Sequence, residues 1–63
     1  MFEYVLHVCT YSSKGKLLES ERFEPMVFEN LEAALFAQAS HRKEYNDRYV
    51  YYIEHRIKLD YPV

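Results

Sequence analysis

The stretch YVYYIEHRIKL at residues 49–59 is the feature that most constrains the fold, because apolar and polar side chains alternate along it. Successive side chains of a β-strand point to opposite faces. One face of this strand would carry Tyr49, Tyr51, Ile53, His55, Ile57 and Leu59, and the other Val50, Tyr52, Glu54, Arg56 and Lys58. A shift of one residue would bury the three charged side chains of the second set, so the register is well specified.

The first part of the chain predicts a β-hairpin. Residues 2–11 alternate in the same way, and a more polar strand is expected over Leu17–Phe23. Between them, the segment 12–15 contains the chain's single glycine and is typical of a turn. Glu19 and Glu21 point outward from the second strand, and Pro25 cannot donate to a ladder. We therefore expect this strand to lie at a sheet edge and to end before Pro25.

The segment FENLEAALFAQASHRKEY changes period and predicts a helix from about residue 31 to residue 45. Asn30 is the expected N-cap, Glu29 and Glu32 lie near the positive helix end, and the helix should stop near Asn46. The stripe expected to face the sheet is Leu31, Ala34, Leu35, Gln38 and Arg42.

The element order predicts a single α+β domain over residues 1–63, β-β-α-β, with the helix packed on one face of a three-stranded antiparallel sheet. A right-handed crossover gives the strand order 2-1-3, and a third strand parallel to the second is the alternative. An eleven-residue strand is about 36 Å long and a fifteen-residue helix about 22 Å. We therefore expect part of the third strand, on its apolar face or along its edge, to be available to another chain.

Phe36 does not share a helix face with Leu31 and Leu35, from which it lies about 140° and about 100° around the axis. One interpretation is a rotated helix, or a ring that folds back over the sheet edge. The other is an exposed anchor for a partner, with small neighbours at Ala33 and Ala37.

Length and composition limit the function. A chain of 63 residues buries only about 60% of its unfolded surface, and its one cysteine cannot form an internal disulfide. A partner or a second copy is therefore the expected source of additional stability. The apolar content of 49% argues against disorder. Neither a membrane-spanning stretch nor a secretory signal is expected, and we predict a cytoplasmic protein.

Chemical motifs are weak throughout. His7 and Cys9 share a strand face, but no orienting group accompanies them, and His55 is interpreted as a hydrogen-bonded core histidine. A metal site would need His7, Cys9, His41 and His55 to converge from separate elements, and one glycine cannot form a phosphate loop. We predict no catalytic residues, no metal site, no cofactor and no enzymatic activity.

A sheet-based nucleic-acid site is a further possibility, because Tyr52, Arg56 and Lys58 share one strand face. The net charge of −2 argues against it. Acidic residues gather in residues 19–32 and basic residues in 42–58. This dipolar pattern favours a protein partner with complementary patches.

The segments Glu29-Asn30-Leu31-Glu32-Ala33-Ala34-Leu35 and Arg56-Ile57-Lys58 resemble parts of the small coliphage inhibitors of bacterial RNA polymerase. The resemblance covers about half the chain and implies a hairpin, one helix and a third strand whose basic pair grips the polymerase. It would place Arg56 and Lys58 against an acidic groove. Lys58 stands where that family has an arginine, and lysine lacks the planar fork needed for a bidentate contact.

We therefore expect a non-enzymatic protein-binding module, of the phage-inhibitor type, that docks on a larger host protein such as RNA polymerase. The alternative is a homodimer joined through its third strands or sheet faces, and a nucleic-acid binder is the third hypothesis. The candidate partner-binding residues are Arg56, Lys58, Tyr52, Glu54 and Phe36.

Overall fold

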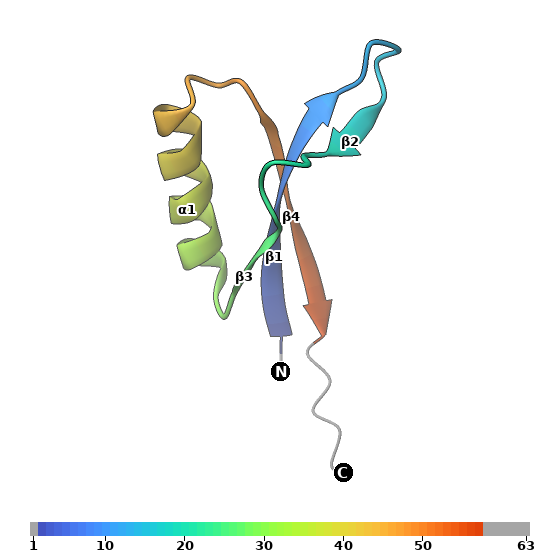
Figure 1. Cartoon of the computed structure of the whole chain (residues 1–63). Helices are drawn as coiled ribbons and strands as arrows, with labels where there is room; N and C mark the ends of the chain where they lie inside the picture. The colour runs from blue at the N-terminus through green and yellow to red at the C-terminus, as the bar shows by residue number, and fades with distance from the viewer. Residues whose placement is uncertain (1, 58–63) are drawn as a thin grey trace.

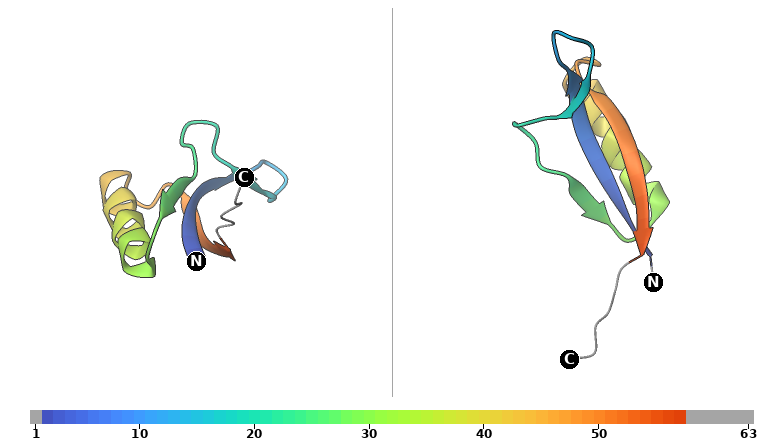
Figure 2. Two further views of the ribbon diagram at one scale, coloured as in Figure 1. Left: turned by 90° about the horizontal axis from the view of Figure 1, so that it is seen from below. Right: turned by 90° about the vertical axis from the view of Figure 1, so that its right-hand side faces the viewer.

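The computed structural model describes residues 2–57, which form one α+β domain (Figure 1). Its elements, in chain order, are β1 (Phe2–Tyr11), β2 (Leu17–Glu19), β3 (Met26–Phe28), α1 (Leu31–Glu44) and β4 (Val50–Ile57). The strands form one antiparallel sheet, and α1 packs on one face of it against β1 and β3. The two views of Figure 2 show α1 on one face of the sheet, next to β3 in the left view and behind β1 and β4 in the right view.

Strand β1 lies at the centre of the sheet. Both β2 and β3 pair with one edge of β1, and β4 pairs with the other edge. The predicted placement of the last strand beside the first, antiparallel, is therefore confirmed. The predicted faces are confirmed as well, because Ile53 lies opposite Leu6 and Tyr51 opposite Val8. The prediction extended this strand to Leu59, which lies outside the described residues.

The prediction for the second strand is wrong beyond Glu19. The Ser20 N–H still bonds to the carbonyl of Val8 at 2.8 Å, but the Ser20 hydroxyl then accepts a hydrogen bond from the Arg22 N–H at 3.1 Å. This local bond turns the chain away from the ladder. The chain returns after Pro25 as β3, which pairs with Tyr4–Leu6 of β1. Two short strands, β2 and β3, thus occupy this edge, where the sequence predicted one strand that ends before Pro25 and did not predict β3.

Helix α1 begins where the sequence predicts and ends within one residue of the predicted position. Its N-cap is Asn30, whose side-chain oxygen accepts the Ala33 N–H at 2.8 Å. The helix ends in a turn at Asn46 and Asp47, which have φ angles of 52° and 57°. Asn and Asp tolerate this left-handed region better than other non-glycine residues, so the polar pair suits the reversal into β4.

The core is small and lies mainly along β1. Leu6 and Val8 point toward α1, whereas Val5 and Cys9 point to the opposite face, and all four are buried. The helix contributes one fully buried residue, Ala34. The stripe predicted to face the sheet is therefore only partly correct. Ala34 is buried and Gln38 half-buried, but Leu31, Leu35 and Arg42 are exposed.

Candidate functional site

The large apolar side chains of α1 face the solvent. Phe36 is 77% exposed, Leu35 49% and Leu31 44%. Residues three and four apart on a helix are neighbours, so Leu31, Leu35 and the exposed Ala39 form a row, with Phe36 beside Ala39. We call these four residues the outer helix face. The exposed-anchor interpretation of Phe36 thus agrees with the position of this side chain.

Small residues of α1 face the sheet. Ala33 and Ala37 are half-buried and Ala34 is fully buried, so methyl groups form much of the contact with β1 and β3, and the half-buried Gln38 and His41 lie on the same side. Small side chains allow the helix backbone to come close to Leu6 and Val8, which provide the bulk of the contact. The usual arrangement, with large apolar residues inside and small or polar residues outside, is reversed in this helix.

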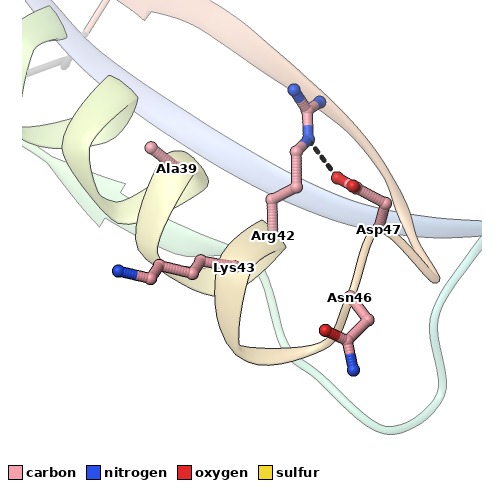
Figure 3. Close-up of a pocket in the computed structure, with 5 residues that line it drawn as sticks. All are labelled: Ala39, Arg42, Lys43, Asn46 and Asp47. Carbon is pink, nitrogen blue, oxygen red and sulfur yellow. Dashed lines mark ion pairs between the residues drawn. The ribbon is translucent and has the colours of Figure 1, made fainter.

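Charged residues lie at both ends of the outer helix face. Glu32 is in the first turn of α1, and Arg42 and Lys43 are in the last. A shallow depression next to Ala39 is lined by Ala39, Arg42, Lys43, Asn46 and Asp47 (Figure 3). Within it, Nε of Arg42 lies 3.4 Å from an oxygen of Asp47. A surface complementary to this face would be apolar at its centre and acidic where it meets the C-terminal end of α1.

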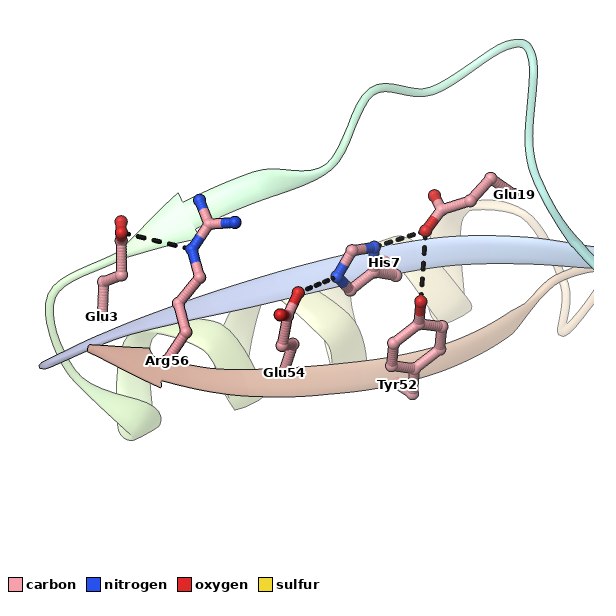
Figure 4. A network of polar contacts seen from close by, with 6 residues as sticks. All are labelled: Glu3, His7, Glu19, Tyr52, Glu54 and Arg56. Carbon is pink, nitrogen blue, oxygen red and sulfur yellow. Dashed lines mark hydrogen bonds and ion pairs between the residues drawn. The ribbon is translucent and has the colours of Figure 1, made fainter. Parts of the chain in front are cut away.

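The open face, which we define as the sheet face opposite α1, carries a network of polar side chains centred on His7 (Figure 4). His7 Nδ1 lies 2.5 Å from Glu19 of β2, and His7 Nε2 lies 2.9 Å from Glu54 of β4. Both ring nitrogens carry hydrogen only in the imidazolium form, so that form satisfies both carboxylates. Through His7, the network connects β1 with β2 and β4.

Tyr52 and Arg56 complete the network of the open face. The Tyr52 ring stacks on His7, with centroids 4.3 Å apart, and its hydroxyl donates to Glu19 at 3.2 Å. Desolvation, and then this hydrogen bond, raise the pKa of the Tyr52 phenol. Arg56 Nε donates to Glu3 at 3.2 Å. These side chains shield the buried Val5 and Cys9 beneath them.

The predicted partner-binding residues therefore fall into three groups. Tyr52, Glu54 and Arg56 lie together on the open face and contact residues of their own chain. Phe36 lies on α1, on the other side of the sheet. Lys58 lies outside the described residues. The structure thus does not bring Phe36 and the basic strand into one surface.

The catalytic and metal candidates are placed as follows. His7 and Cys9 share the open face, but Cys9 is buried, and desolvation followed by the charge of Glu19 raises the pKa of its thiol. A raised pKa disfavours the nucleophilic thiolate. Within residues 2–57, no group of three His, Cys, Asp or Glu side chains is arranged to hold a metal ion. The prediction of His55 as a core histidine is wrong: its ring is exposed and stacks on Tyr4 at 4.8 Å.

An aromatic cluster joins the end of α1 to the loop before β3. The Phe23 ring makes edge contacts with His41, Tyr45 and Tyr49 at centroid distances of 4.6 to 5.3 Å. His41 Nδ1 is hydrogen-bonded to the Tyr51 hydroxyl. Burial, the largest cause, raises the pKa of Tyr51, so its phenol stays neutral at neutral pH. The cluster explains why the chain leaves the sheet edge at Ser20, since this departure brings Phe23 into contact with the helix.

Sequence reasoning missed two features. Leu31 and Leu35 were assigned to the core, although the grouping of Ala33, Ala34 and Ala37 on another side of the helix was a signal that small residues face the sheet. The His7 network was also missed. Its members come from three strands, so only the pairing register brings them together.

Comparison of the chain with protein-family models, with curated proteins and with solved structures gave no match. The resemblance to the coliphage inhibitors therefore stays a prediction. No helix in the described part of the chain has the length and apolar character that crossing a membrane requires.

Proposed function

We propose that this protein is a small, non-enzymatic protein-binding module of the cytoplasm that docks on a larger protein through the outer helix face. The observation that carries the proposal is the reversed arrangement of α1, with Ala34 buried against the sheet and Phe36 exposed to solvent. An amphipathic helix whose apolar residues recur at intervals of three and four can enter a groove of another protein.

Phe36 is the expected anchor. Aromatic residues dominate the energetics of protein interfaces, and the neighbouring Ala39 lets a second surface approach the ring closely. Binding would remove the exposed parts of Phe36, Leu35 and Leu31 from water. Full burial of such a side chain contributes about 1.5 to 3 kcal/mol, and the half-exposed leucines contribute correspondingly less. Arg42 and Lys43 would meet acidic groups at the margin of the groove, where they increase specificity and association rate.

In its most specific form, the proposal takes the partner from the resemblance to the coliphage inhibitors: a host RNA polymerase, inhibited by binding. That resemblance placed the contact at Arg56 and Lys58. Arg56 shares its face with three carboxylates, whereas Phe36 is 77% exposed, so we assign the principal contact to the outer helix face instead. The open face also carries Glu3, Glu19 and Glu54, and these carboxylates oppose binding of a phosphate backbone there.

The test compares single variants in a binding assay with purified bacterial RNA polymerase, alongside quantitative capture from bacterial lysate. We expect Phe36→Glu to weaken binding by about thirtyfold or more, the loss of about 2 kcal/mol typical of an interface anchor. Phe36→Leu should retain most of the affinity. Lys14→Gln in the exposed hairpin turn changes the net charge by the same amount and should bind normally.

The same assay separates the two candidate surfaces. Loss of binding in Arg56→Glu with normal binding in Phe36→Glu would place the contact on the open face and refute the outer helix face. Circular dichroism of each variant should match that of the unsubstituted protein, since Phe36 is exposed and contributes little to the fold. A partner that binds all variants equally would refute docking at either surface.

A further inference from the structure

The two edges of the sheet differ in their protection against pairing with another chain. The edge formed by β2 and β3 consists of two three-residue strands, separated by residues 20–25, which include Pro25. Short, interrupted strands and proline are the usual means by which proteins block an edge. The β2–β3 edge is therefore unsuited to further pairing.

The opposite edge is formed by β4, and it lacks these features. β4 is a regular strand of eight residues without glycine or proline, and within the described residues its only strand partner is β1 (Figures 1 and 2). Its far side therefore presents unpaired backbone N–H and C=O groups. Helix α1 packs mainly over β1 and β3. It contacts β4 at Tyr51 through His41 and Arg42, toward the start of the strand and four residues before His55.

We propose that β4 pairs with β4 of a second copy of this chain, antiparallel, about a two-fold axis at His55. Such a dimer would join the two sheets into one, with both helices on the same face, because directly opposed residues of antiparallel strands share a face. This inference goes beyond the proposed function, since the outer helix face stays free in the dimer.

The charges of β4 select this register. With the axis at His55, Glu54 lies opposite Arg56 of the second copy, and the reverse pair forms on the other side of the axis. An axis one residue earlier would place the two Glu54 side chains opposite each other, which is destabilising. An axis at Ile53 would place Arg56 opposite Val50 and leave the charges unmatched.

Both charged side chains have atoms left for the second pair. Within residues 2–57, Glu54 uses Oε1 toward His7 and Arg56 uses Nε toward Glu3 (Figure 4). The second carboxylate oxygen and the two terminal guanidinium nitrogens therefore remain for a cross-strand contact.

The apolar residues on the helix side of β4 agree with the same register. Ile57 is 62% exposed, and the His55 axis places it opposite the half-buried Ile53 of the second copy. This pair occurs twice in the dimer because of the two-fold symmetry. The dimer would thus cover apolar side chains at the end of the sheet that α1 leaves open.

Cysteine crosslinking tests the register directly. Opposed residues of antiparallel strands have Cα atoms about 4.5 to 5.5 Å apart, within the range of a disulfide. We expect His55→Cys to form a covalent dimer under mild oxidation at low protein concentration. Ile53→Cys is the control, because in this register its two copies are about 13 Å apart. The native Cys9 is buried and should not compete.

A charge-swap experiment gives independent evidence, read by sedimentation over a range of protein concentrations. Arg56→Glu and Glu54→Arg each turn two attractive pairs into two repulsive ones, and we expect each variant alone to dimerise at least about tenfold more weakly. An equimolar mixture of the two variants restores both attractive pairs and should form a heterodimer. Each variant's circular dichroism spectrum shows whether it is folded.

Three results would overturn the proposal: a monomer at every concentration of the unsubstituted protein, crosslinking of Ile53→Cys in preference to His55→Cys, or a mixture that associates no better than its components. A folded monomer would leave the proposed docking through the outer helix face intact. Loss of partner binding in Phe36→Glu with normal dimerisation would show that the two surfaces act separately.

Discussion

At the scale of single residues, the two faces of β1 show how one strand can have two different environments. Leu6 and Val8 are covered by α1, whereas Val5 and Cys9 are buried beneath polar side chains that bond to one another. The chain has no second helix or sheet to cover the open face among its described residues. Hydrogen bonds across three strands, centred on His7, provide that cover instead.

Burial of weakly acidic groups makes stability depend on pH at the alkaline end. The pKa of Cys9 is raised from its ordinary 9.0 and that of Tyr51 from its ordinary 10.0, in both cases chiefly by desolvation. The unfolded chain therefore loses these protons at lower pH than the folded protein. Their contribution to stability is complete below about pH 9 and is lost as the pH rises above it.

We predict that the free energy of unfolding falls between about pH 9 and about pH 11, as measured by urea denaturation. Cys9→Ala and Tyr51→Phe each remove one of the titrating groups, so each should reduce the steepness of this fall, whatever their effect on stability at neutral pH. A stability that is constant or rises over this interval would contradict the prediction.

At the scale of elements, α1 has its small residues toward the sheet and its large ones toward solvent. The buried Ala34 fits a space between the helix backbone and β1 that a larger side chain would have to widen. The helix is nevertheless well defined locally, by the Asn30 cap, Glu32 in its first turn and basic residues in its last. Local signals thus determine where the helix lies in the sequence without determining which side faces the sheet.

This orientation predicts a large effect for one substitution and a small effect for another. Ala34→Leu should destabilise the protein by about 1 to 3 kcal/mol through overpacking. Leu35→Ala should change the free energy of unfolding by no more than about 0.5 kcal/mol, because Leu35 is half exposed and alanine favours helix. Chemical denaturation measures both. If Leu35→Ala proved the more costly, the helix would instead be rotated as its sequence alone suggests.

At the scale of the whole molecule, little apolar surface is protected from water. The buried apolar residues of the described chain are Val5, Leu6, Val8, Cys9 and Ala34. Larger apolar side chains stay exposed, among them Phe36 on the outer helix face and Ile57 at the end of β4. A core of this size gives marginal stability, so pairing of a second copy along β4 would stabilise the fold itself.

We therefore predict that the thermal unfolding midpoint rises with protein concentration. Only folded chains form the dimer, so a higher concentration favours the folded state. The midpoint of Arg56→Glu should be independent of concentration over the range in which the unsubstituted protein dimerises. Scanning calorimetry at several concentrations measures both proteins. A midpoint independent of concentration in the unsubstituted protein would contradict the prediction.

The amino-acid sequence by itself determined β1, α1, β4 and the first part of the edge strand, and which residues of β1 and β4 share a strand face. These properties depend on neighbours close in the chain: the alternation along β1 and β4, the glycine turn at Gly15, and the Asn30 cap. The position of β4 beside β1 also followed, since chain connectivity and handedness leave few alternatives. Tyr52, Glu54 and Arg56 could be placed on one face because side chains alternate along a strand.

Only the tertiary structure decided the rotation of α1, the break of the edge strand at Ser20, and the meeting of His7 with Glu19 and Glu54. Each depends on contacts between residues far apart in the sequence. Phe23 leaves the sheet because His41 and Tyr49 surround it, and α1 turns its alanines inward because Leu6 and Val8 already fill the space beneath it. Local patterns carry no information about such competition for space, and packing resolves it.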